Sequence, residues 1–256
     1  MSPVPQREGR IGLTRQRVRT TLLALSAIVF PITFYYFSPA VVLMGAAEGI
    51  VVGSFLVFSA MLLGSLVFGR AFCGWLCPAG AIGEGVTRLR DRRVSGRGIH
   101  WIKYVIWGPW MGLIVFLAVR SGGLTRVQFT YQTWYGISVS SWNALVIFAI
   151  VLTLIVGLAL TVGRRGFCHT GCWMAPFMVL GTWIRDRLHL PGLRLAADAG
   201  ACVSCGSCTR HCMMSLDVQR MVGDESMTSA ECILCARCVD HCPQNAIALR
   251  FMRSSR

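Results

Sequence analysis

The chain has 256 residues, of which 54% are hydrophobic and 14% are charged, and it carries a formal net charge of +14. This composition is too apolar for an ordinary soluble domain and indicates a protein that crosses a membrane. No nucleic-acid recognition motif accompanies the positive charge, so we expect no nucleic-acid partner.

Four long apolar segments are predicted to be transmembrane helices, at about residues 20–37, 50–68, 104–119 and 142–162. A helix rises about 1.5 Å per residue, so roughly 18–20 residues cross the hydrocarbon core. Buried helices of a soluble core are one alternative. A cleaved signal peptide is another for the first segment, although that segment is long and ends in the bulky sequence FYYF.

Basic residues alternate from loop to loop along the chain. They are frequent before residue 20, between 70 and 103 and after 163, whereas 38–49 has none and 120–141 has only two. Cytoplasmic loops carry the excess of Lys and Arg. We therefore expect a multi-pass protein of the bacterial cytoplasmic (inner) membrane with both termini cytoplasmic. Much of the net charge is then a topology signal, with some attraction to anionic membrane lipid.

A repeated motif follows the second and the fourth apolar segments. FGRAFCGWLCP (68–78) and VGRRGFCHTGC (162–172) each follow a predicted helix pair and contain Cys-x₃-Cys. Two parallel repeats would be related by an axis along the membrane normal, which brings Cys73, Cys77, Cys168 and Cys172 together. If each stretch is helical, cysteines four apart face the same way. The four thiols are candidate ligands of a third Fe–S cluster or another metal. Redox-active thiols and small buried hydrophobes are the alternatives.

Eight further cysteines form two Cys-x₂-Cys-x₂-Cys-x₃-Cys runs, CVSCGSCTRHC (202–212) and CILCARCVDHCP (232–243). This is the ligand pattern of a ferredoxin with two [4Fe–4S] clusters, in which the fourth cysteine of each run binds the other cluster. Zinc ribbons and disulfide frameworks fit the pattern less well. The predicted ligands of cluster 1 are Cys202, Cys205, Cys208 and Cys242, and those of cluster 2 are Cys232, Cys235, Cys238 and Cys212.

The predicted fold is a membrane α-helical domain, with four transmembrane helices in two parallel two-helix repeats, followed by a small α+β two-cluster ferredoxin-like domain. The expected parts are a basic cytoplasmic N-terminus (1–19), the membrane domain (20–194) and the ferredoxin-like domain (195–256). The stretch HLPGLRLAADAG lies at the boundary between the membrane domain and the ferredoxin-like domain and is interpreted as a linker.

A few other residues are weaker candidates. Glu48 and the aromatic stretch 129–138 are candidates for a quinone contact, although a headgroup-level carboxylate and an aromatic belt explain them as well. His169 is a candidate ligand beside Cys168. No hydrolytic or nucleotide-binding motif is present in the sequence, so no catalytic residue is predicted.

Taken together, the helices, the sequence GRAFCGWLCPAG and the C-terminal cysteine runs resemble the NapH, MauN and NosR type of membrane iron–sulfur protein, to which the CcoG type is related. The resemblance implies an electron-transfer subunit that passes electrons between the quinone pool, or a membrane redox partner such as a cytochrome, and a reductase or dehydrogenase system. Such a subunit is not a stand-alone enzyme. The alternative is an assembly factor that reduces a metal, such as copper, or a thiol on a client redox enzyme.

Overall fold

The computed structural model describes residues 7–96 and 98–253. Residues 1–6 of the expected N-terminal segment lie outside this part, and from Arg7 onward the chain is helical. The helices are α1 (Arg7–Thr33), α2 (Pro39–Ala47), α3 (Gly53–Phe68), α4 (Ala71–Trp75), α5 (Pro78–Thr87), α6 (Ile102–Arg120), α7 (Trp142–Thr161), α8 (Gly166–Thr170), α9 (Ala175–Arg187), α10 (Ser207–Arg210), α11 (Val218–Gly223) and α12 (Arg237–Asp240). Two 3₁₀ turns, η1 (Phe34–Phe37) and η2 (Ile99–Trp101), connect them.

The described strands form two small sheets. β1 (Ile50–Val52) pairs in parallel with β2 (Arg126–Gln128), and β3 (Gly192–Ala197) pairs antiparallel with β4 (Ile247–Met252). In the second sheet Gly192 lies opposite Met252 and Ala197 opposite Ile247. The expected linker therefore contains strand β3. Its leucines and alanines form one edge of the small domain, which begins a few residues earlier than the expected position 195.

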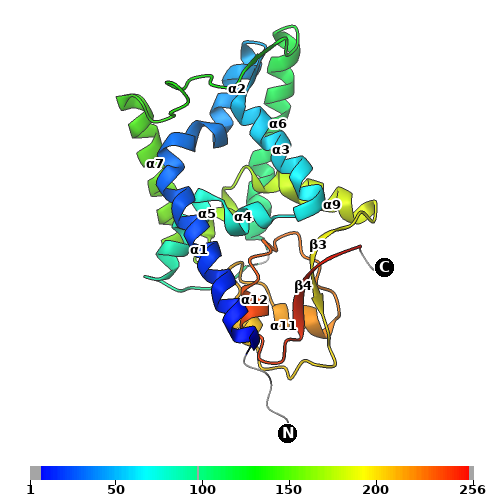
Figure 1. Ribbon diagram of the computed structural model, residues 1–256. Helices are drawn as coiled ribbons and strands as arrows, with labels where there is room; N and C mark the ends of the chain where they lie inside the picture. The colour runs from blue at the N-terminus through cyan, green and yellow to red at the C-terminus, as the bar shows by residue number, and fades with distance from the viewer. Residues whose placement is uncertain (1–6, 97, 254–256) are drawn as a thin grey trace.

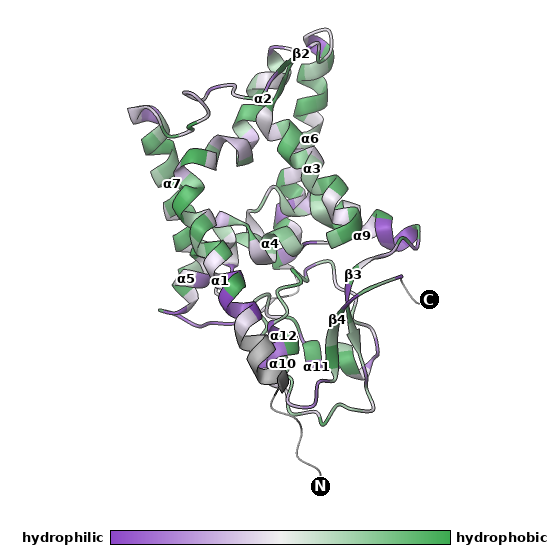
Figure 2. Cartoon of the chain, viewed as in Figure 1, coloured by the Kyte–Doolittle hydropathy of each residue, from purple (hydrophilic) through white to green (hydrophobic). Residues whose placement is uncertain are grey.

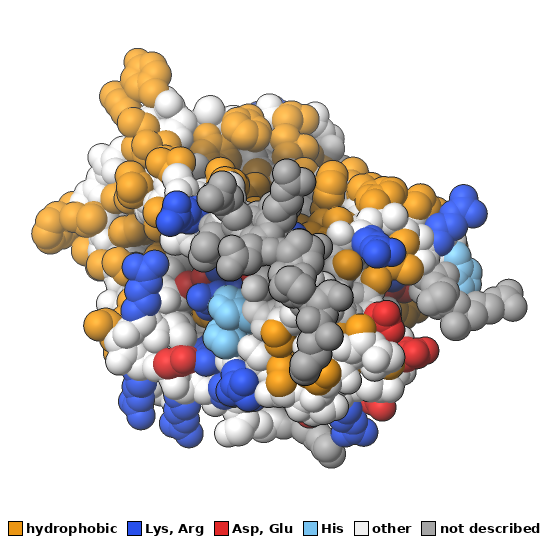
Figure 3. Space-filling model, turned by 60° about the horizontal axis from the view of Figure 1, so that its bottom comes forward, with side chains coloured by type: hydrophobic (Ala, Val, Ile, Leu, Met, Phe, Trp, Pro, Cys, Tyr) orange, Lys and Arg blue, Asp and Glu red, His pale blue; other side chains and the backbone are white. Residues whose placement is uncertain are grey.

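The molecule consists of a helical part and a small cysteine-rich domain below it, and α1 runs past both (Figure 1). Apolar residues dominate α3, α6 and α7, whereas polar residues are frequent around the small domain (Figure 2). Seen from below, the face of the small domain carries charged side chains of both signs, and hydrophobic side chains gather toward the helical part (Figure 3).

Three helical stretches among the described residues are long and apolar enough to cross a membrane: Thr14–Ala47, Ile99–Arg120 and Trp142–Thr161. Helix α3 is apolar but has only 16 residues. Many large apolar side chains on these helices, including Ile28, Val115 and Ile150, are exposed. Contact with lipid tails would explain that exposure, because apolar residues gain nothing from facing water.

Candidate functional site

In both Cys-x₃-Cys elements the first cysteine lies in a five-residue helix and the second lies beyond its end, so neither element is one continuous helical turn. Cys73 lies in α4, which ends at Trp75, and Cys77 precedes Pro78 at the start of α5 with an extended ψ of 119°. Cys168 lies in α8, and Cys172 follows the end of that helix at Thr170. The condition for an i, i+4 pair, a continuous helical turn, is therefore not met in either element. In the first element the reason is Pro78, since a residue before proline is disfavoured in the α region.

The structure nevertheless brings these four thiols together. Cys73, Cys77, Cys168 and Cys172, here named the repeat cysteines, are all buried and belong to one core cluster. Burial raises the pKa of Cys172 to about 12, and the neighbouring Cys168 and Cys73 act in the same direction. Burial also raises the pKa of Cys77, with contributions from the other three repeat cysteines. Four thiols in so dry a place ionise only if a cation or metal compensates their charge.

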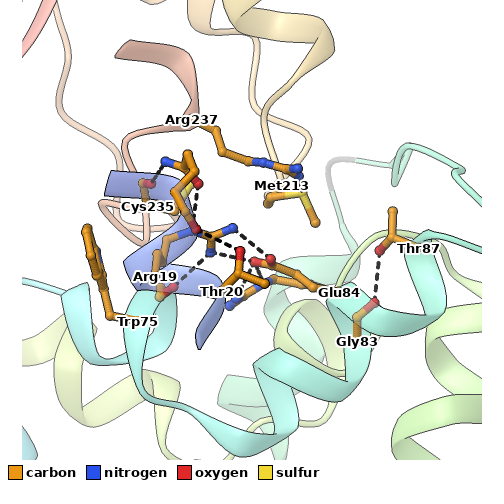
Figure 4. A network of polar contacts seen from close by, with 12 residues as sticks. Arg19, Thr20, Trp75, Gly83, Glu84, Thr87, Met213, Cys235 and Arg237 are labelled. Atoms are coloured by element: carbon orange, nitrogen blue, oxygen red, sulfur yellow. Dashed lines mark hydrogen bonds and ion pairs between the residues drawn. The ribbon is translucent and has the colours of Figure 1, made fainter. Parts of the chain in front are cut away.

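Buried cations lie beside the repeat cysteines. Arg165 precedes Cys168 and donates from Nη1 to the Cys73 carbonyl at 2.5 Å and from Nη2 to the Glu84 carboxylate at 2.6 Å. Arg19 of α1 donates to the same carboxylate at 2.8 and 2.9 Å (Figure 4). Burial alone would raise the pKa of Glu84, but Arg165 and Arg19 hold it at about 2. Glu84 is therefore an ionised carboxylate shared by two cations.

A second triad repeats this arrangement on the other element. Arg70, three residues before Cys73, pairs with Glu231 at 3.0 Å, and Lys103 donates to both oxygens of that carboxylate at 2.5 and 2.7 Å. Burial would raise the pKa of Glu231, but Arg70 and Lys103 hold it at about 2. Each triad has one positive charge in excess, so the surroundings of the repeat cysteines favour an anion.

Several buried polar atoms around the repeat cysteines have no hydrogen-bond partner within the described chain: Nε and Nη2 of Arg70 and Nε2 of His169. Such unpaired buried polar atoms are rare in proteins unless a bound group satisfies them. Four thiols with unpaired cationic donors beside them fit an anionic iron–sulfur group held by thiolates.

One further group near this region offers metal-ligand atoms. Nδ1 of His100 lies 3.0 Å from Nδ1 of His169, and these two rings and Glu231 present ligand atoms within 4.8 Å of one another. Lys103 and Arg70 already neutralise Glu231, so this group is a poor site for an added cation. His169 thus lies beside His100 and between two repeat cysteines.

The eight C-terminal cysteines line two separate cavities in the small domain. The first cavity is lined by Cys212, Cys232, Cys235 and Cys238, here named the inner set. The second is lined by Cys202, Cys205, Cys208 and Cys242, here named the outer set. The structure therefore groups the cysteines in the crossed arrangement expected from the spacing.

The backbone around both sets suits a sulfur-rich group. Ser204 and Gly206 have positive φ in the first run, and Leu234 and Ala236 have positive φ at the equivalent places of the second. These left-handed residues turn the chain tightly around each cavity. The Ala246 N–H donates to Sγ of Cys242 at 3.3 Å, which is the kind of bond that stabilises a ligating thiolate.

The inner set lies against the helical part, next to the first repeat element. The Trp75 indole donates from Nε1 to the Leu234 carbonyl at 3.1 Å, and Gln16 donates to the Cys235 carbonyl at 3.0 Å. Arg164 donates to the Cys212 carbonyl at 3.1 Å. Gly74 packs so closely on the Ile233 carbonyl that a Cβ there would overlap its oxygen.

Met213 follows Cys212 at the place where the second run has Pro243 after Cys242, and it belongs to the same junction. Met213 and Met214 are almost fully buried in the core cluster that contains the repeat cysteines, whereas their counterparts Pro243 and Gln244 are exposed. A flexible thioether fills an irregular interface better than a rigid proline ring. Met213 is therefore explained by the junction between the domains.

Sequence reasoning missed Glu84, Glu231, Lys103 and Arg19, which complete the site from distant parts of the chain. The sequence offers one signal for them, because charged residues beside apolar membrane segments are rare and often functional. The weaker candidate Glu48 follows the end of α2 and accepts a hydrogen bond of 2.7 Å from Tyr131. The structure therefore joins Glu48 to the expected aromatic stretch 129–138.

Apolar helices that carry four clustered thiols, joined to a domain with two cysteine-lined cavities, define a membrane iron–sulfur protein. A family model described as a 4Fe-4S binding domain matches residues 50–97 and again 143–191, and a 4Fe-4S dicluster domain matches 201–247. The double match agrees with an internal duplication that includes both Cys-x₃-Cys elements.

Two curated relatives extend the comparison. The methylamine utilization ferredoxin-type protein MauN of Methylobacillus flagellatus is 26% identical over 188 residues, which cover 72% of this chain and 62% of the relative. An uncharacterized protein of Methanocaldococcus jannaschii is 22% identical over 224 residues, 81% of this chain and 76% of that protein. No solved structure matches. The chain belongs to the NapH/MauN type of ferredoxin-type iron–sulfur proteins and binds iron–sulfur clusters.

Proposed function

We propose that this protein is a membrane-bound electron-transfer subunit that connects the quinone pool, or a membrane redox partner, with a reductase or dehydrogenase system. The observation that carries the proposal is the direct contact between the repeat element of residues 73–77 and the loop of the inner set, through Gly74 and Trp75. Iron–sulfur clusters supply one-electron transfer without making or breaking bonds. The chain's own part is to hold, bury and orient them.

The proposed ligands are the inner set for one [4Fe–4S] cluster and the outer set for the other. The repeat cysteines are proposed as ligands of a third iron–sulfur centre at the base of the helices. Two observations support this third centre: the four thiols are buried together, and unpaired polar atoms of Arg70 and His169 lie in the same region. The excess positive charge of the two triads would stabilise an anionic centre in this dry place.

We further propose that four helices cross the bacterial inner membrane, with α3 as the short fourth span, and that both termini are cytoplasmic. Contacts between the start of α1 and the small domain support this orientation: Arg15 pairs with Asp240, and Gln16 donates to the Asp240 carboxylate at 2.5 Å. The N-terminal end of α1 and the small domain therefore lie on one side.

The test is the iron and acid-labile sulfide content per chain, measured on protein purified without oxygen and accompanied by EPR spectra. Two [4Fe–4S] clusters predict about 8 Fe, and a third centre raises this to roughly 10–12. A variant with Ser at all four repeat cysteines should return to about 8 Fe with the remaining EPR signals unchanged.

An iron content near 8 in both proteins would show that the repeat cysteines are not iron ligands. The assembly-factor alternative would then gain support, because four buried thiols free of iron are available for thiol chemistry or for another metal. Reduction of the wild-type clusters by duroquinol in lipid nanodiscs tests the electron-transfer role itself. Clusters that duroquinol does not reduce would contradict electron entry from the quinone pool.

A further inference from the structure

The two halves of the small domain have equivalent loops in opposite environments. The loop Cys232–Cys235 is covered by the helical part, and its Ile233 side chain is 1% exposed. The equivalent loop Cys202–Cys205 is open to solvent, and its Val203 side chain is 61% exposed. The same difference separates buried Met213 and Met214 from exposed Pro243 and Gln244. The helical part thus covers one face of this pseudo-symmetric domain, and the equivalent face is exposed.

The covered loop shows what kind of contact such a loop makes. Leu234, with φ near 50°, turns its carbonyl to accept the Trp75 indole N–H, and the Ile233 carbonyl lies against the backbone of Gly74. Ser204 has the matching positive φ of 55°. No hydrogen bond from the described residues reaches the carbonyl of Val203 or Ser204. The open loop therefore has the same turn with its Val203 and Ser204 carbonyls unused, whereas the Cys205 carbonyl accepts from Nη1 of Arg210 at 2.9 Å.

We propose that the open face, formed by Val203–Cys205 and Pro243–Asn245, is the docking surface for a small water-soluble one-electron carrier protein. This inference rests on the proposed function and adds which face meets the soluble partner. Cys205 is an exposed residue of the outer set, so a partner seated here lies directly over the cavity that this set lines. The partner should offer an N–H donor and an apolar contact, as Trp75 and Gly74 do at the covered loop.

The surface also predicts the strength and salt dependence of docking. The six residues of the two loops carry no charge, but the exposed Arg210 is bonded to the Cys205 carbonyl beside them and the chain has a net charge of +14. An acidic carrier protein should therefore be attracted electrostatically. Electron-transfer encounters bury little area, typically below about 1,200 Å². We therefore expect weak, transient binding that weakens further as the ionic strength rises.

The experiment measures binding of two soluble probes, a bacterial-type ferredoxin and a flavodoxin, to the full-length protein in immobilised lipid nanodiscs under anaerobic conditions. Val203→Arg should raise the Kd for the bound probe at least about tenfold, which corresponds to a loss of about 1.4 kcal/mol of binding free energy. The matched control is Phe251→Arg, an equally exposed apolar residue of the same domain at the other end of β4. The control should leave the Kd unchanged. Iron content and EPR spectra of both variants should match the wild type.

Three results would overturn the docking proposal: no binding of either probe to the wild type, no effect of Val203→Arg, or an equal effect of both variants. Loss of a homodimer in Val203→Arg, measured by light scattering, would mean instead that a second copy covers this face. Binding does not require cluster reduction. Normal binding with clusters that duroquinol cannot reduce would therefore contradict the quinone link of the proposed function and leave the docking surface standing.

Discussion

At the level of single residues, the site depends on two largely buried carboxylates, Glu84 and Glu231, which each hold two cations beside the repeat cysteines. Removing one carboxylate leaves two buried cations without a counter-charge, which is far worse than losing a surface ion pair. Glu84→Gln should lower the free energy of unfolding by about 3–5 kcal/mol, because Arg19 and Arg165 then lose their shared partner.

The measurement is urea or thermal unfolding in detergent, followed by circular dichroism. Glu225→Gln, which removes an exposed carboxylate, is the control and should change stability by less than about 0.5 kcal/mol. Equal stability of Glu84→Gln and the wild type would mean that Glu84 is not the shared counter-ion of the two arginines.

The sequence predicted the cysteines of this site but not its carboxylates. The two cysteine runs encode their grouping in short fixed spacings, which local geometry can convert into ligand sets. Glu84 meets Arg19 across 65 positions and Arg165 across 81 positions. Nothing local in the chain specifies such pairs, since they form only when α1, α5 and α8 pack together.

At the level of secondary structure, the junction between the helical part and the small domain is set by the short helix α4. Gly74→Val should separate the two parts, because its side chain would overlap the Ile233 carbonyl. We expect faster hydrogen exchange in the loop 232–236 and at the Trp75 indole, with partial loss of iron from the inner set.

Gly85→Ala is the matched control in the neighbouring helix α5. A Cβ at Gly85 meets nothing within 4 Å, so this change should leave exchange unaltered and stabilise the chain by about 0.4–1 kcal/mol. Unchanged exchange in Gly74→Val would show that the two parts do not depend on this contact.

Two secondary-structure expectations from the sequence, one for the Cys-x₃-Cys elements and one for the linker, differ from the structure. Cys-x₃-Cys suggested one helical turn, but Pro78 was already visible in the sequence and disfavours helix at Cys77. The stretch 189–200 was interpreted as a linker because of Pro191 and Gly192, yet the residues from Gly192 to Ala197 form β3. Their partner β4 lies more than 50 residues later, and strand pairing at such distance is decided by the whole domain.

At the level of the whole molecule, the topology depends on whether α3 crosses the bilayer. Sixteen residues span roughly 24 Å, less than the roughly 30 Å hydrocarbon core. A short helix is accommodated by local thinning of the bilayer or by neighbouring residues at the interface. β1 precedes α3 and pairs with β2 after α6, which places the start of α3 and the end of α6 at one level. Four arginines follow α5 and favour a cytoplasmic position for the loop after that helix: Arg88, Arg90, Arg92 and Arg93.

Fusions of a reporter after Arg92 and after Ser121 distinguish the two topologies. If α3 spans, alkaline phosphatase should be inactive after Arg92 and active after Ser121, because the enzyme folds only outside the cytoplasm, whereas green fluorescent protein should give the opposite pattern. If α3 does not span, alkaline phosphatase should be active after Arg92 and inactive after Ser121, and green fluorescent protein should give the opposite pattern. A fusion at the C-terminus should behave like the one after Arg92, since Arg15 near the start of α1 pairs with Asp240 of the small domain. Phosphatase activity at the C-terminus would contradict the shared side of α1 and the small domain, and with it the cytoplasmic docking surface.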